Sequence, residues 1–274
     1  MVYTVQQATL EWARTITTLA FLFYASWSDY KTREVSNKVW ALFAPVAFAL
    51  TFYELYVYDF SQLPFYGICF GLTAVFAVAL FYSGGFGGAD SKALMCLALA
   101  IPFAPANLPK LPHLETSPIS QIFFPVTIFS NAVLLAAFTA VIIFLYNIFW
   151  RLRTGKRLFE GDHKNESLGK KILVLITGYK VPIDKLKEKW HVYPLEDIEE
   201  NAEKGAKRKL IVVPRDEGRT ATVERLDKAV QAGAIQDRIW ASPGLPMLIF
   251  VTAGLIIALL LGDIVWICVR FLLR

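Results

Sequence analysis

Two aspartates in this chain of 274 residues stand at the edges of apolar stretches. Asp29 directly follows the apolar stretch 9–28, and Asp90 follows the glycine-rich segment 84–88. Two carboxyls that share one proton can cleave a peptide bond, because one activates water while the other, protonated, polarises the carbonyl. Such a pair titrates as one unit, since neighbouring like charges cannot both ionise cheaply. We take Asp29 and Asp90 as the candidate catalytic pair.

Each aspartate also has a simpler interpretation. Asp29 could be an ordinary charge at a helix end, and Asp90 could be the N-cap of the apolar helix that Ser91 opens. Four glycines among the five residues 84–88 indicate more than a cap, because glycine lets a backbone approach another chain closely and adopt positive φ. No Gly-Lys-Ser/Thr follows, so the segment is not a phosphate-binding P-loop.

Other chemistry has little support in the sequence. The cysteines form no Cys-x-x-Cys pair, and the histidines are far apart in the chain. We therefore expect neither a metal site nor a cofactor. The residues concerned are Cys69, Cys96, Cys268, His113, His163 and His191.

The apolar residues, 55% of the chain, come in blocks. A helix needs about 20 mainly apolar residues to cross a membrane. The first block lacks a basic start and a cleavage site, so we interpret it as a membrane helix and not as a signal peptide. The sequence predicts an all-α polytopic membrane protein with about six transmembrane helices, at 9–28, 39–58, 63–82, 91–106, 121–150 and 243–270.

A charged insert separates the last two predicted spans. Residues 151–240 hold 20 Lys and Arg and 15 Asp and Glu. Strands are predicted at 190–193 and 210–213 and a helix at 220–231, which indicates a small α+β domain. Nucleic-acid binding is the alternative, but the acidic residues are interleaved and leave no basic stripe, so we expect no nucleic-acid partner.

The domains follow from this layout, and the orientation follows from the basic residues. We expect a membrane domain at 1–150, a soluble cytoplasmic insert at 151–240 and the last transmembrane helix at 241–274. The loop after the first span contains Lys31 and two further basic residues, whereas the loop after the second contains none. Since basic loops stay inside, the N-terminus is expected outside, with both aspartates and the insert on the cytoplasmic side.

Short motifs around both aspartates resemble a known family. Gly87-Gly-Ala-Asp90, followed by Lys92, resembles the second catalytic motif of the GxGD membrane aspartic proteases. Ala89 replaces a glycine of the bacterial prepilin peptidases, which points to the archaeal preflagellin and type IV prepilin peptidases. Residues 29–37 are similar to the first motif of that family, and 238–246 resemble its re-entry into the last span.

This resemblance implies an aspartic endopeptidase without a cofactor. Members remove class III signal peptides from preflagellins and prepilins, which carry a basic leader before a hydrophobic helix, at the cytoplasmic face of the lipid bilayer. Gly87, Gly88 and Ala89 would shape the site beside Asp90, as would Lys92. Glu34 would attract the basic leader. Bacterial relatives that methylate the product often carry Cys-x-x-Cys motifs, so we expect cleavage without methylation.

Three other functions stay open from the residues alone. Asp29 and Asp90 would serve a proton-coupled transporter as a relay, although such proteins usually have repeated halves and acids near the middle of the membrane. A membrane scaffold would explain the charged insert but not the glycine-rich segment. Proteolysis within the hydrocarbon core is disfavoured because Asp29 adjoins a basic loop.

Polar and small residues inside the predicted spans have structural explanations. Asp263 lies at the predicted outer side and is expected to be structural. Asn131 and Asn147 are expected to form hydrogen bonds between helices, and Gly67 and Gly71 form a Gly-x-x-x-Gly pair suited to helix packing.

Overall fold

The computed structural model describes most of the chain, namely residues 5–84, 86–106, 117–201, 205–212 and 218–273. Gly85, His113 and Val213, which entered the expectations above, lie outside these residues. The chain divides into two compact units, one formed by 1–136 with 246–274 and the other by 137–245.

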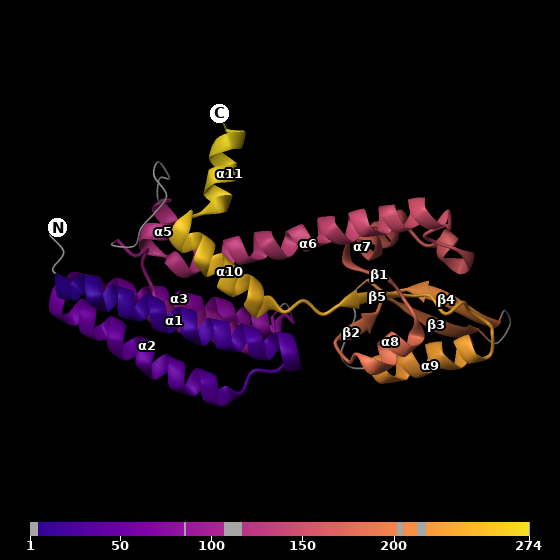
Figure 1. Cartoon of the computed structure of the whole chain (residues 1–274), viewed down its shortest axis with the longest axis horizontal. Coiled ribbons are helices and arrows are strands. Elements are labelled where there is room, and N and C mark those ends of the chain that lie inside the picture. The colour runs from indigo at the N-terminus through magenta and orange to yellow at the C-terminus, as the bar shows by residue number, and fades with distance from the viewer. Residues whose placement is uncertain (1–4, 85, 107–116, 202–204, 213–217, 274) are drawn as a thin grey trace. The chain divides into compact units, whose positions relative to one another are not determined.

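The first unit is helical (Figure 1). Its helices are α1 (Val5–Thr32), α2 (Asn37–Tyr58), the short 3₁₀ turn η1 (Phe60–Gln62), α3 (Leu63–Tyr82), α4 (Gly88–Ala100), α5 (Pro118–Ile122), the first part of α6 (Phe124–Thr154), α10 (Met247–Leu260) and α11 (Ile264–Leu272).

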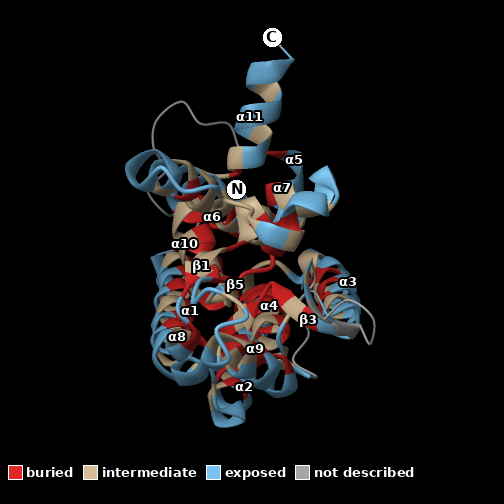
Figure 2. Ribbon diagram, turned by 90° about the vertical axis from the view of Figure 1, so that its right-hand side faces the viewer, coloured by how far each residue is buried: buried red, intermediate tan, exposed pale blue. Residues whose placement is uncertain are grey.

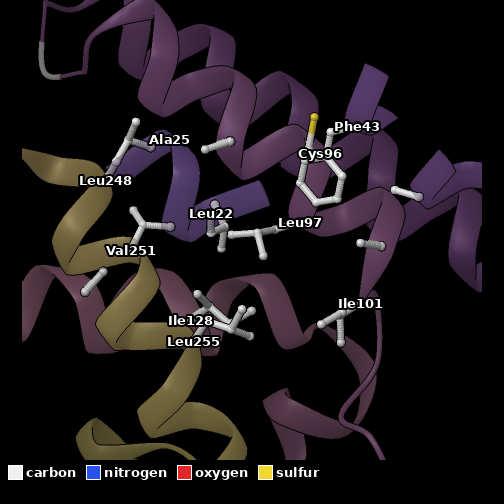
Figure 3. Packing of buried hydrophobic residues seen from close by; sticks show 14 of the residues in the cluster. Leu22, Ala25, Phe43, Cys96, Leu97, Ile101, Ile128, Leu248, Val251 and Leu255 are labelled. Atoms are coloured by element: carbon white, nitrogen blue, oxygen red, sulfur yellow. The ribbon is translucent and has the colours of Figure 1, made fainter. Parts of the chain in front are cut away.

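Helix α4 lies at the centre of this unit. It contacts α1, α2, α3 and α10. Its residues Ala93 and Leu97 are fully buried and belong to one apolar cluster with Leu22 of α1, Phe43 of α2 and Leu248 of α10. Figure 3 shows several of these side chains converging between the helices. Because protein surrounds α4, its surface does not need to be uniformly apolar to lie inside a membrane.

Three helices, α2, α3 together with η1, and α6, are long and apolar enough to cross a membrane. The pair α10 and α11 makes a fourth if it is one broken span, since the two helices meet at a bend of 66°. Thus three or four of the six predicted spans meet this test. Helix α4 has only 13 residues, about 20 Å at 1.5 Å per residue, and α1 carries Glu11 and Arg14 within its length.

Glu11 and Arg14 of α1 are buried within the first unit, which was not anticipated. Arg14 Nε lies 2.8 Å from Glu54 Oε2 of α2, and Arg14 also donates a hydrogen bond to the Ala100 carbonyl at the end of α4. Thr51 of α2 donates to the same carbonyl. These contacts join the three helices, so the charge of Arg14 faces the other helices of the bundle.

The bend between α10 and α11 is built from specific polar contacts. Gly262 adopts a left-handed φ of 79°. Asp263 is the N-cap of α11, and its side chain accepts a hydrogen bond from the Trp266 N–H. Asn131 of α6 donates to the Gly262 carbonyl and accepts from the Ile264 N–H, which confirms its interhelical role. Helix α11 contains no buried residue (Figure 2).

The second unit combines helices with two small antiparallel sheets. One sheet has the order β1-β5-β2 and the other is the hairpin β3-β4. Asn147, in the part of α6 that belongs to this unit, donates to the carbonyls of Leu175 and Gly178 at the end of α7. The remaining elements are η2 (Gly161–Asn165), α7 (Leu168–Thr177), β1 (Tyr179–Val181), α8 (Ile183–Glu188), β2 (Val192–Pro194), β3 (Glu196–Asn201), β4 (Gly205–Leu210), α9 (Arg219–Gln231) and β5 (Ile239–Pro243).

The predicted helix at 220–231 is confirmed as α9, but the strands differ from the prediction. The strand expected at 190–193 is β2, shifted toward the C-terminus, and the apolar run 210–213 begins where β4 ends. The observed hairpin is rich in charged residues. Arg208 of β4 forms an ion pair of 2.7 Å with Glu196 of β3. A search for alternating apolar residues therefore missed it.

Helices α6 and α10 lie close together at Gly254. A Cβ atom there would lie 2.6 Å from the Ile128 carbonyl oxygen and 2.9 Å from the Ala132 nitrogen. By contrast, a Cβ atom at Gly67 or Gly71 would meet nothing within 4 Å. The close helix contact in this unit is thus at Gly254, and the Gly-x-x-x-Gly pair of α3 faces open space.

Gly254→Ala should therefore lower the stability of the protein by about 1–3 kcal/mol, because the added methyl group meets rigid backbone. Thermal unfolding of the detergent-solubilised protein would measure the effect. Gly71→Ala is the matched control, since it adds the same methyl group to a membrane helix in open space and should not lower the melting temperature. Equal melting temperatures for both variants would contradict the packing described here.

Candidate active site

Asp29 lies in the last turn of α1, just beyond the predicted span 9–28. Ala25, one turn earlier on the same helix face, is fully buried in the central cluster, and this packing fixes the direction of the Asp29 side chain. Burial raises the pKa of Asp29, while the nearby Arg33 charge and the Leu248 N–H lower it. Its Oδ2 atom is buried and accepts no hydrogen bond from the described residues.

Asp90 lies in the first turn of α4, before the predicted span 91–106. Its Oδ2 atom accepts a hydrogen bond of 3.1 Å from the N–H of Gly87, the N-cap residue. Asp90 is therefore the third residue of the helix and not the N-cap that the simpler interpretation expected. A Cβ atom on Gly87 would lie 3.1 Å from the same oxygen, so glycine provides the room for this carboxylate.

The two carboxyls influence each other across α1 and α4. Burial, followed by the negative charge of Asp29, raises the pKa of Asp90 to about 6, and the Gly87 N–H opposes this shift. Below a pH of about 6 Asp90 is therefore mostly protonated, whereas for Asp29 the Arg33 charge and the Leu248 N–H oppose the effect of burial and favour its ionised form. This division between an acid and a base is what hydrolysis of a peptide bond requires.

Lys92 of α4 forms a hydrogen bond with the start of α2. Its Nζ atom donates a hydrogen bond of 2.7 Å to Asn37 Oδ1, at the start of α2. Asn37 ends the loop that follows Asp29, so this bond joins that loop to the first turn of α4. Through Asn37, Lys92 therefore links the start of α4 to the start of α2.

The other predicted site residues lie around this core. Gly88 follows the N-cap, where a Cβ atom would lie 3.5 Å from Phe81. Ala89 packs against the central apolar cluster. Glu34 is exposed, and its carbonyl accepts a hydrogen bond of 2.7 Å from Ser28 Oγ. Glu34 therefore lies in the loop beside Asp29 with its side chain accessible.

Sequence reasoning missed two contributors to the site. Arg33 was counted only for the orientation of the chain, yet its charge acts on Asp29 and its backbone adopts a left-handed φ of 57°. Helix α10 was expected only to span the membrane. Ser26 of α1 donates to the Leu248 carbonyl and lies 2.8 Å from Thr252 Oγ1, which holds the start of α10 against the end of α1. The signal in the sequence was the presence of two hydroxyl residues, Ser26 and Thr252, inside predicted apolar spans.

Within the described part of the chain, no group of three or more His, Cys, Asp or Glu side chains is placed to hold a metal ion.

Comparison with known proteins identifies two regions. Residues 16–146 match the type IV leader peptidase family, and residues 170–264 match the family described as archaeal peptidase A24 C-terminus, type II. The preflagellin peptidase of Methanococcus voltae is 27% identical over 249 residues, covering 88% of this chain and 92% of that protein. The preflagellin peptidase of Methanococcus maripaludis is 23% identical over 256 residues, with the same coverage.

Replacing Asp29 by Asn should lower the pKa of Asp90, because the neighbouring negative charge disappears while burial remains. Isotope-labelled NMR of the aspartate carboxyl carbons, with Asp90 assigned by substitution, would follow the titration. Glu34→Gln removes a negative charge from the same loop and should leave the titration of Asp90 unchanged. If Asp29→Asn also left it unchanged, the two carboxyls would not be neighbours.

Proposed function

This chain belongs to the type IV leader peptidase family, and from that premise we propose that it is a membrane aspartic endopeptidase with Asp29 and Asp90 as its catalytic residues. Its substrates would be preflagellins and related type IV pilin-like precursors, in agreement with the names of the relatives. The observation that carries the proposal is the pair of carboxyls from α1 and α4, one of which has its pKa raised to about 6 beside the other.

The proposed reaction needs only these two groups and one water molecule. Ionised Asp29 takes a proton from water as the water oxygen bonds to the scissile carbonyl carbon, and protonated Asp90 gives its proton to the carbonyl oxygen. The tetrahedral intermediate then collapses. The C–N bond breaks, the leaving nitrogen takes the proton held by Asp29, and Asp90 regains its own from the hydroxyl group.

The roles of the two aspartates follow from their surroundings. Burial raises the pKa of Asp29, but the charge of Arg33 and the Leu248 N–H at the start of α10 oppose this shift and favour the ionised form that the base needs. Burial and the Asp29 charge favour the protonated form of Asp90, which suits the acid. Since interacting carboxyls titrate together, the shared proton belongs to the pair.

The family and its apolar helices indicate a multi-pass membrane protein, for which we propose six crossings. Helices α1 and α4 would cross as well, because α4 is surrounded by other helices and the charge of Arg14 in α1 faces the bundle. The membrane domain would comprise 1–150 and the last span 241–274. The basic residues in the loop after the first span support a cytoplasmic position for the aspartates and for the insert 151–240.

This placement suits a precursor with a basic leader and an apolar helix. The apolar helix would lie in the bilayer while the leader meets the exposed Glu34 in the loop after Asp29. Gly87 and Gly88 would let the extended peptide backbone approach Asp90 closely. The product would be released without methylation.

Asp29→Asn and Asp90→Asn should each reduce cleavage by at least roughly 10²–10⁴-fold, because each removes one half of the acid–base pair. The assay mixes membranes containing the protein with a preflagellin and measures the mass of the N-terminal product. Asp59→Asn, at the far end of α2, is the matched control and should cleave normally. Retained cleavage in a folded, inserted Asp29 or Asp90 variant would remove that residue from the mechanism.

The rate should also depend on pH in a defined direction. Asp90 must carry the shared proton, and its pKa is raised to about 6, so kcat/KM should fall as the pH rises through that value. Stopped assays across the acid and neutral range, with enzyme integrity checked at each pH, would give the profile. A rate that kept rising well above the pKa of Asp90 would contradict the assignment of Asp90 as the acid.

A further inference from the structure

An apolar cavity of about 270 Å³ lies in the first unit, apart from the two carboxyls. Leu72 and Phe76 of α3 form one wall, and Val126 and Phe129 of α6 form the other. Leu94 of α4 lies at its base and is almost fully buried. Apart from the hydroxyl of Thr73, the side chains that line the cavity are apolar.

The cavity starts one helical turn from the candidate catalytic acid. Leu94 follows Asp90 by four residues on α4, so the two side chains lie on the same face of that helix. The glycine-rich segment contacts one of the lining residues, because the Phe86 ring packs against the Phe129 ring with centroids 5.6 Å apart. Phe129 also contacts Phe76, at 5.2 Å, across the two walls. The cavity therefore adjoins the glycine-rich segment through Phe129 and adjoins Asp90 through Leu94.

The walls of the cavity belong to candidate membrane helices and carry exposed apolar side chains. Both α3 and α6 are candidate membrane spans, and Leu72, Phe76 and Val126 are 57%, 41% and 39% exposed. An occupant would therefore enter from the hydrocarbon region and not from water. A cavity of about 150 Å³ binds one benzene molecule, so this larger cavity has room for one or two bulky apolar side chains but not for a whole helix.

We propose that this cavity is the socket that binds bulky apolar side chains from the first two turns of the precursor's hydrophobic helix. The inference rests on the proposed function and adds a determinant of substrate specificity to it. A helix anchored in the socket would begin near Asp90, so the extended residues before it would lie at the two carboxyls. The socket would thus select precursors with large apolar residues directly after the cleavage site and set the position of the cut.

Filling the socket tests the inference. Leu72→Trp and, on the opposite wall, Val126→Trp place a large ring in the cavity. Val75→Trp is the matched control, because Val75 is 69% exposed on the same helix α3 and does not line the cavity. Each variant, reconstituted in vesicles, is assayed with a full-length precursor and with a short leader peptide that spans the cleavage site but lacks the apolar helix.

We expect Leu72→Trp and Val126→Trp to raise KM for the full-length precursor roughly five- to tenfold, a modest factor because helices in a bilayer gain from packing and not from leaving water. The leader peptide should be cut with unchanged KM, and Val75→Trp should match the wild type on both substrates. A precursor whose bulky residues in the first two helical turns are changed to Ala should show the same rise in KM with the wild type, and no further rise with Leu72→Trp.

The possible failures are distinguishable. If the wild type cuts neither substrate, the proposed function is wrong and the socket falls with it. If the wild type cuts both but the two filling variants leave KM for the precursor unchanged, the function stands and the cavity is a lipid-filled crevice. An equal rise in KM with Val75→Trp would show a general effect on the membrane surface of α3 and would also overturn the socket.

Discussion

The structure depends above all on the enclosure of one short helix. Helix α4 has 13 residues and is surrounded by α1, α2, α3 and α10, so its first turn carries Asp90 into surroundings that disfavour charge. A carboxyl in such a place keeps its proton to a higher pH than one in water. The same enclosure lets a helix of this length serve inside a bundle where an isolated helix would leave its ends in hydrocarbon.

The second carboxyl is held by different means. Asp29 ends α1, whose hydroxyl groups and apolar side chains pack against the start of α10, the helix that follows the insert in sequence. The N-terminal segment of the first unit and the segment that follows the insert are therefore in contact beside Asp29. At the other end of α1, the buried pair of Arg14 and Glu54 and the Ala100 carbonyl join α1, α2 and α4. The N-terminal half of α1 is thus held by a buried ion pair, and its C-terminal end, which carries Asp29, is held by hydroxyl and apolar contacts with α10.

The sequence was sufficient for local features and insufficient for those that depend on partners. Asp29 and Asp90 stood out because a carboxyl at the end of an apolar stretch needs an explanation, and the helix at 220–231 followed from its period. The bend between α10 and α11 could not be foreseen, because it arises from Asn131, far away in the chain. The hairpin β3-β4 was missed because its strands carry charged residues that pair across it and do not alternate between apolar and polar residues. The roles of Leu248 and Arg33 beside Asp29 likewise appear only when the chain is folded.

The central claim, that the carboxyls of α1 and α4 meet on one side of the membrane, is open to direct measurement. Cys69, Cys96 and Cys268 would be replaced, and single cysteines introduced at positions 29 and 90 together. A short bifunctional thiol reagent applied to inside-out vesicles should join the two positions within one chain, and an impermeant thiol reagent should reach both from the same side. Labelling of the two positions from opposite faces of the membrane, with no crosslink, would contradict the account.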